Sequence, residues 1–224
     1  MPYIKKYSPT FLALLFHITG LLGILFTPYK DWFVYSTPIV LLTMFLLLSN
    51  TQIKLAKEYF IFFMIAFLIG MGTEIIGVNT GLLFGDYQYG QVLGPKINGV
   101  PLLIGLNWFI IIFCSGSLLL QCFDLLERKL NINITPSTFS IIVVLGGAAI
   151  ATCFDIILEP VAVKLNFWSW ENGHIPLLNY ICWFVISAVL LGIKMYFKKI
   201  KVNTFATSLI IIQALFFLIL NLFL

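Results

Sequence analysis

The stretch IIVVLGGAAIATCFDIIL (residues 141–158) contains a single charged residue, Asp155. A helix needs about 20 predominantly apolar residues to cross the hydrocarbon core of a bilayer, and this stretch forms most of an apolar run over residues 138–158. The sequence therefore predicts an all-α polytopic membrane protein with about seven transmembrane helices, in a single integral membrane domain (residues 1–224). The other six apolar runs occupy residues 9–26, 33–49, 59–78, 102–123, 177–197 and 204–223.

The composition excludes a soluble domain. Hydrophobic residues make up 61% of the chain and charged residues 10%, whereas soluble domains average about 45–50% and about 25% respectively. Thirteen basic and nine acidic residues cannot cover the surface of a soluble protein of 224 residues. The net charge of +4 does not indicate nucleic-acid binding, because the basic residues are distributed among several loops.

The basic residues are unequally divided between the two sides of the predicted membrane. Lys30, Lys96 and Lys164 are the three that fall on the side opposite the N-terminus. Cytoplasmic loops carry the excess of Lys and Arg, so we expect a cytoplasmic (inner) membrane protein with its N-terminus in the cytoplasm and its C-terminus outside. The ten basic residues on the N-terminal side are Lys5, Lys6, Lys54, Lys57, Arg128, Lys129, Lys194, Lys198, Lys199 and Lys201.

Two outer loops, residues 79–101 and 159–176, differ from the short basic connectors on the other side. Both are rich in Gly, Pro, Asn and aromatic residues, and each follows a carboxylate inside the predicted membrane. A charged side chain costs at least about 2.5–3.5 kcal/mol at the centre of a spanning helix and is a functional candidate by default. We therefore expect the functional site near the outer face.

The two outer regions also resemble each other. TEIIGVNTGLLFGDYQYG (73–90) aligns with FDIILEPVAVKLNFWSWENG (154–173), which places Glu74 over Asp155. In both copies an aromatic residue follows the acid by thirteen positions. The alternative is chance similarity between apolar segments. We interpret the pattern as a parallel internal repeat of spans three–four and five–six, about an axis along the membrane normal, with units at about 59–123 and 138–197.

Four carboxylates are expected to converge near the outer face. Asp155 and Glu159 are four residues apart, and so share a helical face; Pro160 is expected to end that helix, because the residue before a proline avoids helical geometry. Glu74 and Asp86 belong to the other outer region. Neighbouring carboxylates in apolar surroundings favour the protonated form, which is that of a general acid. The alternative is that these acids cap helices or pair with outer lysines.

Six aromatic residues lie close to these acids in the sequence. The faces of aromatic rings stabilise a cation, so the residues are candidates for substrate binding. The alternative is an interfacial aromatic belt, which accounts for some of them but does not require the Gly-rich loops. The six are Tyr87, Tyr89, Trp108, Trp168, Trp170 and Trp183.

The sequence lacks the residues that bind di-iron, retinal or nucleotide cofactors. Two histidines, His17 and His174, are too few for a histidine-rich di-iron site, and the last span has no lysine for a retinal Schiff base. The sequence contains neither a P-loop nor a glycine-rich dinucleotide motif after a strand. We therefore expect no metal and no cofactor, and acid–base chemistry on a lipid. A proton-coupled transporter could use the same acids, although such transporters commonly have inverted repeats.

The outer motifs resemble the carotenoid 1,2-hydratase family of the CruF type, which includes the archaeal bisanhydrobacterioruberin hydratases. The resemblance covers most of the chain, is densest from about 70 to 185, and is weak in the first and last helices. It is carried by GTEIIGVNTGLLFGDYQYG (72–90), LGPKINGVPLLIGLNWF (93–109), FDIILEPVAVKLNFW (154–168) and IPLLNYICWF (175–184).

The resemblance implies a cofactor-free step of carotenoid biosynthesis in the bilayer. Water would add across the terminal 1,2 double bond of an acyclic (ψ) carotenoid end group, as in γ-carotene or lycopene derivatives, and give a tertiary 1-hydroxy carotenoid. The partners expected on this basis are the carotenoid substrate, the lipid membrane and other enzymes of the carotenoid pathway. A carotenoid end-group cyclase, which begins with the same protonation but then loses a proton, is the nearest alternative.

This chemistry suggests roles for individual residues. Protonation of the double bond gives a tertiary cation that water captures, which requires a general acid, an aromatic wall and controlled water. We expect Asp155 to donate the proton and Glu74 to keep it protonated or to orient water, with Glu159 and Asp86 as alternates. Asn107 is a candidate water ligand. The expected cation-facing residues are Tyr87, Trp168 and Trp170.

Overall fold

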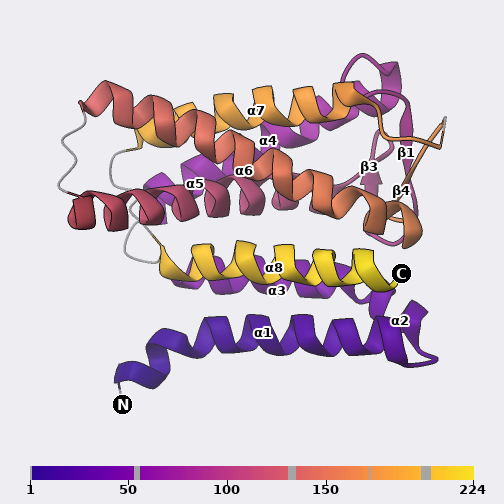
Figure 1. Ribbon diagram of the computed structural model, residues 1–224. Helices are drawn as coiled ribbons and strands as arrows, with labels where there is room; N and C mark the ends of the chain where they lie inside the picture. The colour runs from indigo at the N-terminus through magenta and orange to yellow at the C-terminus, as the bar shows by residue number, and fades with distance from the viewer. Residues whose placement is uncertain (1, 53–55, 131–134, 172, 198–202) are drawn as a thin grey trace.

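The computed structural model describes residues 2–52, 56–130, 135–171, 173–197 and 203–224. Its helices run side by side in one bundle, and four short strands gather at one end, which we call the strand end (Figure 1). The N-terminus lies at the opposite end and the C-terminus at the strand end. The helices are α1 (Pro2–Phe26), α2 (Lys30–Tyr35), α3 (Thr37–Asn50), α4 (Ala56–Thr80), α5 (Leu102–Leu130), α6 (Pro136–Lys164), α7 (Leu177–Tyr196) and α8 (Thr204–Phe223).

Seven helical segments within the described residues are long and apolar enough to cross a membrane. They coincide with the seven predicted apolar runs, and the second combines α2 and α3 into Lys30–Asn50. The predicted all-α polytopic membrane fold is therefore confirmed, with two small sheets added to it.

Helix α5 is the central helix of the bundle. In the most apolar stretch of its span 72% of the residues are buried, against 17% in the corresponding stretches of α1 and of α2–α3. It packs against α3, α4, α6, α7 and α8, and every residue from 108 to 114 is buried. A helix that is apolar on all sides belongs in a core, so α5 supplies the wall that these five helices share.

Glycines allow α5, α6 and α7 to approach closely. A Cβ atom on Gly147 of α6 would lie 2.8 Å from Cδ1 of Leu191 and 3.7 Å from the Cα atom of Gly116. A Cβ atom on Gly70 of α4 would lie 2.6 Å from Cγ of Trp108 on α5. Small residues at such crossings let backbones approach in membrane bundles, and here they also leave room for Trp108.

Pro160 does not end its helix. Helix α6 continues through it to Lys164, so the prediction that the helix ends after Glu159 is wrong. Proline removes one backbone donor and crowds the preceding turn, but Val161 and Ala162 after it are fully buried. Lys164 in the last turn also complements the negative end of the helix. Packing thus outweighs the cost of the proline, and Glu159 stays within a regular helix.

Two antiparallel strand pairs form at the strand end. Strands β2 (Lys96–Ile97) and β3 (Val100–Pro101) make a hairpin, and its turn residues Asn98 and Gly99 have φ values of 47° and 85°. An Asn-Gly turn with two positive φ angles is preferred in two-residue hairpins. Strands β1 (Tyr87–Tyr89) and β4 (Trp168–Trp170) pair with each other and so join the two long loops.

The register of β1 and β4 bears on the proposed internal repeat. The pairing is centred on Gln88 and Ser169, which are equivalent positions when the two outer regions are aligned. A twofold axis between the loops would produce such a symmetric antiparallel register. The register is consistent with the repeat, which itself remains a prediction.

We expect Gly147→Leu to destabilise the protein, because overpacking a tight contact typically costs about 1–3 kcal/mol. Gly192→Leu on α7 is the matched control, since a Cβ atom there would meet nothing within 4 Å. Thermal unfolding of the detergent-solubilised variants measures the difference. Equal unfolding temperatures for the two variants would show that the glycine contact does not hold α6 against α7.

Candidate active site

Three carboxyl groups surround one small cavity at the strand end, which we call the acid chamber. Glu74 comes from α4, and Asp155 and Glu159 come from successive turns of α6. Their side chains are 5%, 2% and 2% exposed, respectively. The chamber has a volume of about 20 Å³, which is room for about one water molecule.

Three donors hold the carboxyl group of Glu74. The hydroxyl groups of Tyr87 and Tyr89 both donate to Oε2, the second over 2.7 Å, and the indole N–H of Trp108 donates to Oε1 over 2.8 Å. Hydrogen bonds of this kind are strongest when the acceptor is ionised. Because both oxygens accept and the three donors come from β1 and α5, the position and orientation of Glu74 are tightly defined.

The other two acids share a donor. The side-chain amide of Asn179 on α7 donates to Oδ2 of Asp155 over 2.7 Å and lies 3.5 Å from Oε1 of Glu159. The indole N–H groups of Trp168 and Trp170 donate to Oε2 of Glu159 over 2.9 and 3.0 Å. Glu159 is therefore held from β4 and α7 together, whereas Asp155 is held from α7.

Strands β1 and β4 place four aromatic side chains next to these acids. Successive side chains of a strand point to opposite faces, and in β1 Tyr87 and Tyr89 are buried while Gln88 between them is exposed. Trp168 and Trp170 of β4 follow the same alternation and pair with the two tyrosines. The two-stranded sheet thus places its four rings on the acid chamber.

Stacked indole rings form another wall of the chamber. The rings of Trp108 on α5 and Trp183 on α7 are nearly parallel, at 11°, with centroids 3.9 Å apart. The rings of Tyr87 and Trp170 lie 5.1 Å apart at 37°. Aromatic faces attract a cation within about 6 Å, so the chamber combines acids with surfaces that stabilise positive charge.

The two tyrosines remain hydrogen-bond donors at neutral pH. Burial, and then the negative charge of Glu74, raise the pKa values of Tyr87 and Tyr89 far above the ordinary value for a phenol. Both hydroxyl groups therefore keep their protons throughout the physiological range, and the hydrogen bonds to Glu74 persist across it.

Most of the predicted site residues line the acid chamber. Asp86 does not: it lines a separate hollow with Lys96 and Glu171. Asp86 lies directly before β1 and is exposed, whereas Tyr87, the first residue of the strand, is buried. The predicted residues that line the chamber are Glu74, Asp155, Glu159, Tyr87, Tyr89, Trp108, Trp168, Trp170, Trp183 and Asn107.

Four residues of the chamber were not predicted from the sequence: Phe84, Ile104, Leu158 and Asn179. Ile104 and Leu158 are ordinary apolar residues of spanning helices. Asn179 lies three residues after Pro176, at the start of an apolar run, where a polar side chain could have marked it. Phe84 has a φ of 64° and is almost fully buried, but a phenylalanine carries no sequence signal of its own. Among the residues that the structure describes, no group of three or more His, Cys, Asp or Glu side chains is arranged to hold a metal ion.

The chain is similar to known proteins of carotenoid biosynthesis. A curated protein from Haloarcula japonica, bisanhydrobacterioruberin hydratase, is 30% identical over 126 residues, which are 54% of this chain and 40% of that protein. No solved structure matches the chain. The resemblance to a carotenoid hydratase-type family is confirmed. The model of the family described as "Carotenoid biosynthesis protein" matches residues 34–224, and the chain therefore belongs to this family.

Proposed function

We propose that this protein is a carotenoid 1,2-hydratase, a hydro-lyase that adds water to the terminal double bond of an acyclic (ψ) carotenoid end group. The observation that carries the proposal is the acid chamber, where three buried carboxyl groups and several aromatic rings surround a space for about one water molecule. The hydratase from Haloarcula japonica supports the same class of reaction.

The reaction begins with proton transfer from Asp155. The two π electrons of the terminal double bond form a new C2–H bond with this proton, and C1 becomes a tertiary cation. We assign the donor role to Asp155 because Asn179 binds its Oδ2 atom, so that Oδ1 can carry the proton. Glu159, one turn away, remains the alternate donor.

Water then captures the cation. Its oxygen forms a bond to C1, and one of its protons passes to the ionised Asp155, which restores the starting acid. The net change is the addition of one water molecule with no gain or loss of electrons. The reaction therefore needs no oxidant and no reductant.

The remaining residues of the chamber stabilise the cation and guide the water. Glu74, held by three donors, supplies a fixed negative charge. The rings of Tyr87, Trp168 and Trp170 offer their faces to the cation. Asn107 lies on the wall of the chamber, and its amide is suited to binding the attacking water.

The orientation of the protein in the membrane follows from its charges in this proposal. The strand end carries the minority of the basic residues, so we place it outside the cytoplasmic membrane, with the N-terminus inside. Four of the basic residues that support this orientation lie outside the described part of the chain: Lys54, Lys198, Lys199 and Lys201.

Expression in a host that makes lycopene or γ-carotene tests the activity. We expect pigments whose mass increases by one water for each end group that reacts, measured by mass spectrometry of the extracted carotenoids. Pigments of unchanged mass but altered absorption would instead identify a cyclase. Unchanged pigments together with proton flux in vesicles would favour a transporter.

Substitution of the acids tests their roles. Asp155→Asn should lower the hydration rate at least about 100-fold, because a positioned general acid contributes about 10²–10⁴-fold. Glu74→Gln should also lower the rate, because it removes the negative charge that stabilises the cation. The rate is measured with purified protein, and the yield of folded protein is checked by size-exclusion chromatography. Asp31→Asn and Glu171→Gln are matched controls at exposed positions and should retain the activity. Full activity in both acid variants would contradict the proposed acid pair.

A further inference from the structure

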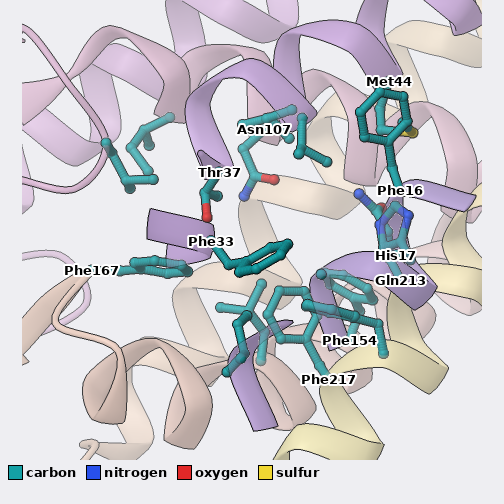
Figure 2. A pocket seen from close by; sticks show the side chains of 18 of the residues that line it. Phe16, His17, Phe33, Thr37, Met44, Asn107, Phe154, Phe167, Gln213 and Phe217 are labelled. Atoms are coloured by element: carbon teal, nitrogen blue, oxygen red, sulfur yellow. The ribbon is translucent and has the colours of Figure 1, made fainter. Parts of the chain in front are cut away.

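A second cavity lies beside the acid chamber, between α1, α2, α3, α5, α6 and α8. Its volume of about 110 Å³ is several times that of the chamber, and most of its lining is apolar. We call it the tail cavity. Figure 2 shows its aromatic and aliphatic side chains, among them Phe16, Phe33, Met44, Phe154 and Phe217.

The tail cavity and the acid chamber share a wall. Four residues line both spaces: Ile104 and Asn107 of α5, Leu158 of α6, and Trp168 of β4. Leu158 lies between Asp155 and Glu159 in the sequence. A molecule in the tail cavity would therefore contact the same residues that line the chamber of the acids.

The tail cavity extends from the strand end toward the middle of the bundle. On α1 its lining residues run from Ile24 to Phe16, eight positions that correspond to about 12 Å along the helix axis. Its deeper part includes His17 and Gln213, which lie on one side of the cavity in Figure 2, while Asn107 lies on another. The Nδ1 atom of His17 bonds to the carbonyl of Ala13 over 2.7 Å.

We propose that the tail cavity holds the conjugated hydrocarbon chain next to the reacting end group of a carotenoid. This inference rests on the proposed function, because it places the rest of the same substrate. The chamber has room for about one water molecule, so the apolar chain must lie elsewhere. The tail cavity is mostly apolar, extends about 12 Å along α1 and shares a wall with the chamber, as a linear hydrocarbon next to the acids requires.

The arrangement gives water and substrate separate places. Water occupies the acid chamber among Glu74, Asp155 and Glu159, and the hydrocarbon approaches from the tail cavity past Asn107 and Trp168. The terminal double bond then stops at the shared wall, where the acid and the water can reach C2 and C1. A linear chain fits this path, and the path thereby selects acyclic end groups.

Filling the tail cavity should weaken substrate binding. Val40 of α3 and Gly20 of α1 line it, and a Cβ atom on Gly20 would lie 3.6 Å from the ring of Phe216. We expect Val40→Phe and Gly20→Leu to raise the apparent Kd for lycopene at least about tenfold, since one misplaced methylene in an apolar pocket costs about 10–200-fold. Quenching of tryptophan fluorescence by lycopene in detergent measures the Kd, independently of hydration.

Each variant has a control of the same type. Ile39→Phe introduces the same ring at the neighbouring, exposed position of α3, and Gly192→Leu adds the same side chain where no atom lies within 4 Å of the new Cβ. Both controls should bind lycopene like the unmodified protein. Thermal unfolding of all four variants shows whether each is folded, and either cavity variant suffices for the test.

The outcomes separate this inference from the proposed function. If lycopene is hydrated but the folded cavity variants bind it with unchanged Kd, the chain lies elsewhere and the inference is wrong while the hydratase proposal stands. If lycopene binding depends on Val40 and Gly20 but no water is added, the tail cavity is supported and the hydratase proposal fails. If the unmodified protein does not bind lycopene, the inference is also overturned.

Discussion

The structure depends on keeping three buried carboxyl groups hydrogen bonded inside a membrane bundle. An unpaired polar group in an apolar environment costs several kcal/mol, and each acid here accepts hydrogen bonds from elements other than its own helix. The β1–β4 sheet supplies two tyrosines to Glu74 and two tryptophans to Glu159, and α7 supplies Asn179. The long loops, the strands and the glycine contacts thus all help to place donors around the three acids.

The spanning helices were predictable because an apolar run of sufficient length has few alternatives in a membrane. The strands were not predicted, since two- and three-residue strands contain too few residues for a periodic pattern and β1 pairs with a strand far away in the sequence. The predicted end of α6 was wrong, because the local cost of Pro160 is smaller than the stabilisation from packing of the turn that follows it.

The acids and aromatic residues of the chamber were accessible from sequence because charge is rare within the spans. Asp86 shows the limit of that argument, since it belongs to a loop outside the spans and lines a different hollow. Asn179 belongs to the site because its amide bonds to two acids that lie twenty or more positions before it, a contact that the sequence does not show. The tail cavity is lined mostly by apolar residues from six helices, which no local sequence pattern connects.

The central claim is that an acid proton, exchangeable with solvent, is added to C2 of the end group when C1 gains its hydroxyl group. Reaction of the purified protein with lycopene in heavy water tests it most directly, with the products analysed by mass spectrometry and NMR. The account predicts one non-exchangeable deuterium at C2 for each end group that gains a hydroxyl group. A hydroxylated product without deuterium at C2 would contradict it, because the oxygen would then have entered without protonation of the double bond.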